Sequence, residues 1–211
     1  MTLVTTSRRL PDDRYECETR QLGAVRIAGV DEVGRGPLAG PVSAAAVVLD
    51  FDRLPEGLRD SKQLSSKRRE LLAKAIHATA DLCIVHVGVE DIAQLNILGA
   101  AHLAMRQALA GLAQPADFAL IDGKLAPKGL NLPHRMVVKG DAKVLSIAAA
   151  SIVAKVARDG IMADLARTHP GYGWETNAGY PTPEHRAALA RLGVTPHHRR
   201  SFAPVHKILC R

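Results

Sequence analysis

The chain has 211 residues, of which 47% are hydrophobic and 23% are charged. This composition is typical of a globular protein and too apolar for a disordered one, and the length allows one substantial core without demanding a second large domain. The net charge of +7 makes a polyanionic partner plausible, although a merely basic surface explains it equally well.

The N-terminal segment, residues 1–21, mixes charges throughout and contains no apolar stretch long enough for a signal peptide or a membrane anchor. The three cysteines are far apart and form no Cys-x-x-Cys pair, which argues against a disulfide framework or a zinc site and fits a reducing cytoplasm. We therefore expect a cytoplasmic protein without membrane contact, in which residues 1–21 form a mobile N-terminal extension.

Two runs rich in apolar and β-branched residues, 25–33 and 42–51, predict two strands joined by a tight glycine turn. Residues 66–80 then predict an amphipathic helix with Ser65 or Ser66 as its N-cap. The pattern continues with a strand, a helix, two short strands and a long helix, at 82–89, 91–112, 118–121, 136–138 and 142–167.

Glycine and proline become frequent after His169, which indicates a loop or a domain border. A further helix is predicted from Pro183, with Thr182 as its N-cap and Gly193 closing it in a left-handed conformation. We expect a mixed α/β domain over 22–168 and a small, mainly helical C-terminal module over 169–211.

Acidic residues end or closely follow three of the predicted strands, namely Asp31 with Glu32, then Asp122, then Asp141. Buried carboxylates need a cation, hydrogen bonds or a raised pKa, and adjacent ones repel each other. If the strands share one sheet, the four acids converge into the all-oxygen environment that magnesium or manganese prefers. A lone aspartate at a strand end is more often a turn former, so this prediction depends on the combination.

A carboxylate cluster of this kind suits phosphodiester hydrolysis, because two cations about 3.5–4 Å apart can activate water and neutralise the leaving oxygen. Successive side chains of a strand point to opposite faces, so Asp31 and Glu32 can share a site only if the strand twists or ends there. The glycine turn that begins at Gly34 favours such an end.

The segment 34–39 also matches the dinucleotide-binding pattern G-x-G-x-x-A. Residues 42–51 predict a strand where that motif requires a helix, and the acidic doublet would face the pyrophosphate. We therefore set the dinucleotide interpretation aside.

The opening segment GVDEVGRGPLAGP, residues 29–41, resembles the signature of the prokaryotic ribonuclease HII family. Other segments resemble that family in the expected order between Ile27 and Val205: DSKQLS at 60–65, IDG at 121–123, KGD at 139–141, IAAASIVAKVARD at 147–159, GYPT at 179–182 and HHRRSF at 197–202. The resemblance implies a ribonuclease H-like mixed sheet flanked by helices, with a C-terminal helical module.

The resemblance also implies roles for particular residues. It makes Asp31, Glu32, Asp122 and Asp141 the four catalytic acids, which bind magnesium or manganese. It makes Gly34, Arg35 and Gly36 the loop that senses a ribose 2′-hydroxyl at an RNA to DNA junction, and Tyr180 the ring that packs against the sugar there. A glycine loop can approach a sugar closely, and the 2′-hydroxyl is what distinguishes RNA from DNA.

Further candidates for phosphate contacts are Lys62, Lys143, Ser146, Ser151 and Lys155. For Lys155, an ion pair with Asp159 at i, i+4 spacing is an equally good interpretation. The basic run 197–200 either binds phosphates, which we prefer, or is simply solvated.

The resemblance implies an endonuclease that hydrolyses the RNA strand of RNA/DNA hybrids and cuts 5′ to ribonucleotides embedded in duplex DNA, leaving a 3′-hydroxyl and a 5′-phosphate. Its role would be ribonucleotide removal and primer processing in replication and repair, and we expect a monomer. Two alternatives stay open: a hybrid-binding module without catalysis, and a metal-dependent nuclease or polynucleotidyl transferase that acts on DNA.

Overall fold

The computed structural model describes residues 10–210, and within them five strands form one mixed sheet. Along the chain the strands are β1 (Ile27–Val33), β2 (Val42–Val48), β3 (Asp81–Val87), β4 (Phe118–Asp122) and β5 (His134–Val137). Their order in the sheet is β3-β2-β1-β4-β5. β1, β2 and β3 pair antiparallel, whereas β4 pairs parallel with both β1 and β5.

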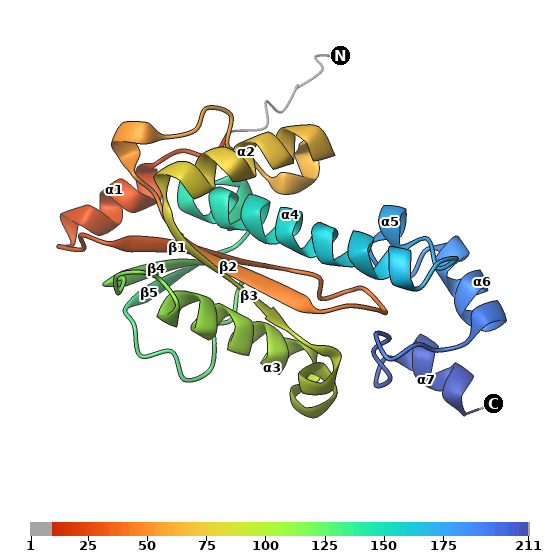
Figure 1. Ribbon diagram of the computed structural model, residues 1–211. Coiled ribbons are helices and arrows are strands. Elements are labelled where there is room, and N and C mark those ends of the chain that lie inside the picture. The colour runs from red at the N-terminus through yellow and green to blue at the C-terminus, as the bar shows by residue number, and fades with distance from the viewer. Residues whose placement is uncertain (1–9, 211) are drawn as a thin grey trace, which may run out of the picture.

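The helices are α1 (Arg14–Gln21), α2 (Ser66–Thr79), α3 (Val89–Ala110), α4 (Leu145–Thr168), α5 (Trp174–Asn177), α6 (Pro183–Leu192) and α7 (Ala203–Leu209). α2 and α4 cover one face of the sheet and α3 covers the other (Figure 1). The expected α/β class with a flanked mixed sheet is therefore confirmed. In the part of the chain that is described, no helix is both long and apolar enough to cross a bilayer.

Alternating small residues of β2 form both layers of the core. Ala44 and Ala46 belong to the apolar cluster under α3, while Ala45 and Val47 belong to the cluster under α2 and α4, as the two-residue period of a strand requires. On β1, Gly29 lets α4 approach the sheet, because a Cβ there would lie 2.1 Å from the Ser146 carbonyl carbon. This close packing fixes α4 across the centre of the sheet.

The N-terminal segment differs from the expectation of a mobile extension. Residues 14–21 form α1, and the buried carboxylate of Glu16 accepts hydrogen bonds from the Ser146 backbone N–H at 2.9 Å and from its hydroxyl at 2.8 Å. The N-cap of α4, Val144, makes no side-chain cap hydrogen bond, so Glu16 supplies an acceptor for the first turn of α4 from a different helix. The structure therefore differs from that expectation by a helix over residues 14–21 that packs against α4, whereas the mobility of the segment stays a prediction and residues 1–9 lie outside the described part.

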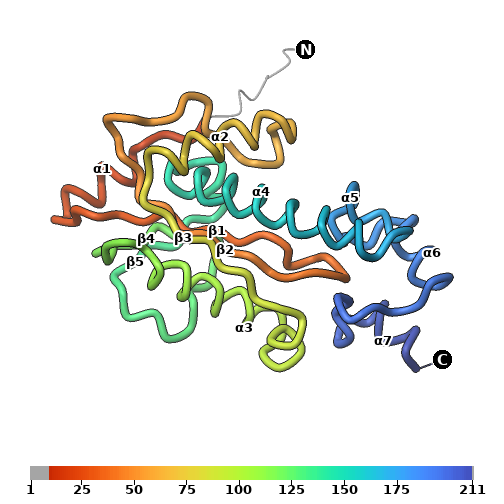
Figure 2. Tube along the Cα trace, in the orientation of Figure 1, coloured from red at the N-terminus to blue at the C-terminus, as the bar shows by residue number. Residues whose placement is uncertain are grey.

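The C-terminal helices α5 and α6 lie at the far end of α4, and α7 follows beside α6, farther from α4 (Figure 2). Thr182 caps α6 by accepting from the His185 backbone N–H at 3.1 Å, and Pro183 occupies the first turn, as the sequence predicts. Buried Leu38 and Met162 join the apolar cluster of these helices. The segment between β1 and β2 is therefore packed directly against the C-terminal helices.

Candidate active site

The parallel register of β1 and β4 brings two of the predicted acids side by side. Val30 pairs with Ile121 as the last pair of the ladder, so the next position on each strand is Asp31 and Asp122. Asp31 is only 4% exposed, and one carboxylate oxygen accepts from the Glu32 backbone N–H at 2.8 Å. Two carboxylates therefore meet where this ladder ends.

Asp141 reaches the same place through the 3-10 helix η3 (Gly140–Ala142), which follows β5. The Gly140 backbone N–H donates to Asp122 Oδ1 at 2.7 Å and so ties η3 to the end of β4. A side chain at position 140 would displace buried Ile147, because a Cβ there would lie 2.6 Å from Ile147 Cδ1. Glycine in the Lys-Gly-Asp segment thus lets Asp141 approach Asp122.

Glu32 faces a hollow on the α3 side of the sheet. β1 does not end at the doublet, as the sequence analysis expected, but stays paired with β2 as far as Val33. Glu32 lines a hollow of about 360 Å³ together with Asp122 and His102, and its Oε1 accepts from Arg35 Nη1 at 3.2 Å. Asp122 therefore follows Asp31 in the β1–β4 register and also shares a hollow with Glu32.

The electrostatics of Asp31, Glu32 and Asp122 reflect burial and mutual repulsion. Burial, then the charges of Glu32 and Asp122, raise the pKa of Asp31 well above its usual value, against a hydrogen bond from Ser151. Burial raises the pKa of Glu32, against the charge of Arg35, and burial also raises the pKa of Asp122, against the Gly140 hydrogen bond. Negative charge is thus concentrated where it costs free energy unless cations compensate it.

The cation nearest to Asp141 is Lys62, whose Nζ lies 3.1 Å from Asp141 Oδ2 although its side chain is 77% exposed. Among residues 10–210, no three histidine, cysteine, aspartate or glutamate side chains are already arranged to hold one metal ion. The donors nonetheless fit hard divalent cations, which take carboxylate oxygens as ligands. Repulsion between buried carboxylates is what such a cation would relieve.

The Gly-Arg-Gly loop and the predicted tyrosine lie against each other. A Cβ at Gly36 would lie 3.4 Å from Tyr180 Cε1, and residue Tyr180 is 42% exposed. Gly34 has φ +88°, and a Cβ there would lie 2.2 Å from Arg158 Nε. Only glycine therefore fits at position 34, whereas Arg35 and Gly36 face solvent beside the ring.

Two buried arginines hold this loop in place. Arg199 donates to the carbonyls of Gly34 at 2.6 Å and Arg35 at 3.0 Å, and it also binds those of residues 40 and 41. Arg158 donates to the carbonyls of residues 39, 41 and 178. Burial and the neighbouring Arg158 charge lower the pKa of Arg199 to about 9. The functional part of Arg158 was not predicted from the sequence. The residue lies near the end of the segment 147–159, where no local pattern indicates that its side chain is buried.

The phosphate-contact candidates separate by exposure. Ser146 is buried and its hydroxyl donates to Glu16. Ser151 is also buried and shares a 3.0 Å hydrogen bond with Ser61. Lys143, in contrast, is exposed beside Lys62 and Asp141. Ser146 is therefore not available to a substrate.

The basic run and Lys155 also differ from the simplest expectation. Lys155 donates to Asp159 at 2.6 Å, so the ion-pair interpretation holds in this structure. His198 and Arg199 are buried, which corrects the preference for phosphate binding along 197–200, and Arg200 stays exposed.

Comparisons of the sequence with known families and proteins agree on one family. A family model described as Ribonuclease HII matches residues 28–205. The ribonuclease HII of Paracoccus denitrificans is 62% identical over 201 residues, which cover 95% of this chain and 96% of the relative.

Solved structures share the fold. The ribonuclease H2 of Pyrococcus horikoshii has a TM-score of 0.76 at 28% identity, covering 87% of this chain and 97% of that chain. A structure of Bst-RNase HIII in complex with Mn²⁺ has a TM-score of 0.70 at 21% identity, covering 90% and 71%, and supports the fold alone.

Proposed function

Because the chain belongs to the ribonuclease HII family, we propose that Asp31, Glu32, Asp122 and Asp141 are its catalytic and metal-binding residues. The protein is a hydrolase, an endoribonuclease of the ribonuclease H type that acts on RNA/DNA hybrids. The observation that supports the proposal most is the parallel register of β1 and β4. Val30 pairs with Ile121, so Asp31 and Asp122 are the next residues on the two neighbouring strands.

The family depends on a divalent cation, and here magnesium or manganese would be held by the four acids. When bound, such cations supply positive charge to the scissile phosphate and lower the pKa of water. The chain's own residues do the rest: the carboxylates fix the ions, and Gly140 orients Asp122 through its 2.7 Å hydrogen bond. The structural neighbour with bound Mn²⁺ makes manganese the first ion to test.

Recognition of the ribose falls to the loop of Gly34, Arg35 and Gly36 together with Tyr180. The exposed Gly36 backbone can approach a 2′-hydroxyl, and the half-exposed Tyr180 ring beside it offers a surface for the sugar. Exposed Lys62 and Lys143 would position phosphates without reading sequence. Residues 22–168 would then be the catalytic domain and 169–211 the substrate-binding module.

The cut falls 5′ to the ribonucleotide and leaves a 3′-hydroxyl and a 5′-phosphate. This reaction suits removal of single ribonucleotides from duplex DNA and processing of RNA primers during replication and repair. Both roles require the ribose to be read on one side of the scissile phosphate.

The test is cleavage of a DNA duplex that contains one ribonucleotide, in magnesium and then in manganese. Asp31→Asn should bind this duplex as the parent does while kcat falls by at least about a hundredfold, since one ligand charge is lost. Asp164→Asn, on the exposed part of α4, is the matched control and should keep full activity. Unchanged turnover of Asp31→Asn would remove that residue from the catalytic set.

The same assay separates the alternatives. Cleavage of an all-DNA duplex would favour a general DNA nuclease, and binding without cleavage in either metal would favour a non-catalytic hybrid-binding module. Adding a chelator should abolish cleavage if divalent cations are required.

A further inference from the structure

The turn that carries Lys62 contacts one acid of the cluster, Asp141, and the helix α4 at Ser151. Lys62 Nζ lies 3.1 Å from Asp141 Oδ2, and the Ser61 hydroxyl shares a 3.0 Å hydrogen bond with that of Ser151. Both residues belong to the 3-10 helix η2 (Ser61–Gln63). A shift of this turn would therefore move the only lysine that pairs with a cluster acid among the described residues.

Arg69 of α2 holds the two ends of that turn. Its Nη1 donates to the carbonyl of Ser61 at 3.1 Å and to the carbonyl of Leu64 at 2.7 Å. Its side chain is 15% exposed, although the residues before and after it on α2 are exposed. A guanidinium can bind two carbonyls from one nitrogen and an acid from another, in a fixed planar geometry that the single ammonium of a lysine does not impose.

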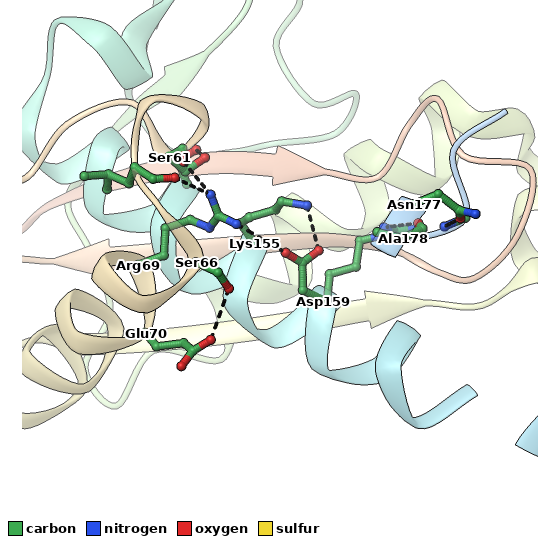
Figure 3. A network of polar contacts seen from close by, with 12 residues as sticks. Ser61, Ser66, Arg69, Glu70, Lys155, Asp159, Asn177 and Ala178 are labelled. Carbon is green, nitrogen blue, oxygen red and sulfur yellow. Dashed lines mark hydrogen bonds and ion pairs between the residues drawn. The ribbon is translucent and has the colours of Figure 1, made fainter. Parts of the chain in front are cut away.

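Asp159 of α4 holds Arg69 from the other side. Arg69 Nη2 lies 3.8 Å from Asp159 Oδ2, and Lys155 Nζ donates to Asp159 Oδ1 at 2.6 Å. Figure 3 shows this chain of contacts running from Ser61 through Arg69 to Asp159 and Lys155. Ser151, Lys155 and Asp159 follow each other at i, i+4 spacing on α4, so α4 contacts the turn directly at Ser151 and indirectly through Arg69.

The hollow beside this network is unsuited to a phosphate. It measures about 540 Å³ and is lined by the acids Glu70, Asp159 and Glu175 against the bases Arg69 and Lys155. Both bases of this hollow bind Asp159 and are therefore already paired with an acid of the protein.

We infer that Arg69, held by Asp159, is a positioning residue for catalysis, which fixes the 61–64 turn so that Lys62 stays at Asp141. This inference rests on the proposed function, because it gives Lys62 and Asp141 a part in cleavage. Arg69 touches neither the substrate nor the four acids and acts through Lys62.

The experiment is a double-mutant cycle with the single-ribonucleotide duplex. Arg69→Gln should lower kcat about tenfold with KM for the duplex nearly unchanged, because small misplacements in an active site are costly. In a Lys62→Ala background the same substitution should lower kcat less than about twofold, since the group it positions is gone. Arg68→Gln, which loses the same charge one residue earlier where the side chain binds the Glu56 carbonyl, is the matched control and should keep the parental kcat.

Equal losses from Arg69→Gln with and without Lys62, or no loss in either background, would overturn the inference. Asp159→Asn releases Arg69 from its other end and should give the same non-additivity with a smaller loss. It therefore tests the inference even if Arg69→Gln does not fold, which a thermal unfolding scan of each variant detects. Full activity of Asp31→Asn would instead refute the proposed function.

Discussion

Gly34 and Gly36 lie two residues apart and face different constraints. Gly34 has a left-handed backbone and no room for a methyl group beside Arg158, whereas a Cβ at Gly36 would make ordinary contact with the Tyr180 ring. The fold therefore requires glycine at position 34. It does not require glycine at position 36, so the need for glycine there can come from substrate binding.

We predict that Gly34→Ala lowers the free energy of unfolding by at least about 1–2 kcal/mol, the cost of a left-handed alanine before any clash is counted. Gly36→Ala should stay within about 0.5 kcal/mol of the parent but lower kcat/KM, because the methyl would occupy the space for the ribose. Urea unfolding and cleavage of the single-ribonucleotide duplex measure the two effects. A fully active Gly36→Ala protein would contradict the assignment of this loop.

At the scale of an element, α1 is attached to α4 by one buried carboxylate. Glu16 accepts two hydrogen bonds from Ser146, while Glu18 on the same helix makes an exposed ion pair with Arg135. Buried acceptors contribute far more to stability than exposed ion pairs do.

Glu16→Ala should therefore lower the free energy of unfolding by about 1–3 kcal/mol, because two buried donors lose their acceptor. Glu16→Gln should restore part of this, since its amide oxygen still accepts, and Glu18→Ala should cost less than about 1 kcal/mol. Hydrogen exchange of the α1 amides would locate the change. Equal stability of the Glu16→Ala and Glu18→Ala proteins would show that the buried carboxylate contributes nothing.

The C-terminal helices enclose a pair of neutral histidines. The Thr195 backbone N–H donates to His198 Nδ1 at 3.0 Å, so the proton of His198 is on Nε2, which lies 3.2 Å from His185 Nε2. His185 Nε2 also accepts from Trp174 Nε1 at 3.0 Å. Burial, then the neighbouring His185, lower the pKa of His198 from 6.5 to about 4.

Acid should consequently destabilise these helices. The unfolded chain takes up a proton at His198 below pH 6.5, while the folded chain does so only near pH 4. The contribution of His198 to the free energy of unfolding is therefore complete above pH 6.5 and decreases as the pH drops. Between pH 6.5 and 5 we expect a loss of about 2 kcal/mol from this residue. His198→Asn, which keeps an acceptor for Thr195, should show a flatter dependence in urea unfolding across this range. An identical slope in both proteins would contradict the assignment.

At the scale of the whole molecule, the carboxylate cluster stores repulsion between elements far apart in sequence. Burial raises the pKa of Asp31, Glu32 and Asp122. The folded protein therefore gains from any cation that binds there, by mass action.

Manganese should raise the midpoint of thermal unfolding, with a gain near 2.7 kcal/mol at about a hundred times the dissociation constant. Asp122→Asn should lose most of this shift without being less stable in a chelator, because removing one charge relieves repulsion. Asp164→Asn should retain the shift. Absence of any shift in the parent protein would argue against a metal site at the cluster.

Local patterns in the sequence determined the elements around the site. Apolar runs and helical spacing predicted β1 to β5, α2, α3, α4 and α6 to within a few residues, because the two-residue and 3.6-residue periods are local properties of the chain. The acids at strand ends marked the candidate site in the same way, whereas the Gly-Arg-Gly segment was assigned to it only by the resemblance to the ribonuclease HII family.

Tertiary structure decided which charged residues are buried and which carboxylates are neighbours. The sequence predicts surface positions for three charged residues, Glu16, Arg158 and Arg199, because isolated charges are seldom buried. All three are buried, and each forms hydrogen bonds with a segment that is distant in sequence. The adjacency of Asp31 and Asp122 likewise depends on a strand register across ninety-one positions of sequence. Long-range packing sets such contacts, and no local pattern contains them.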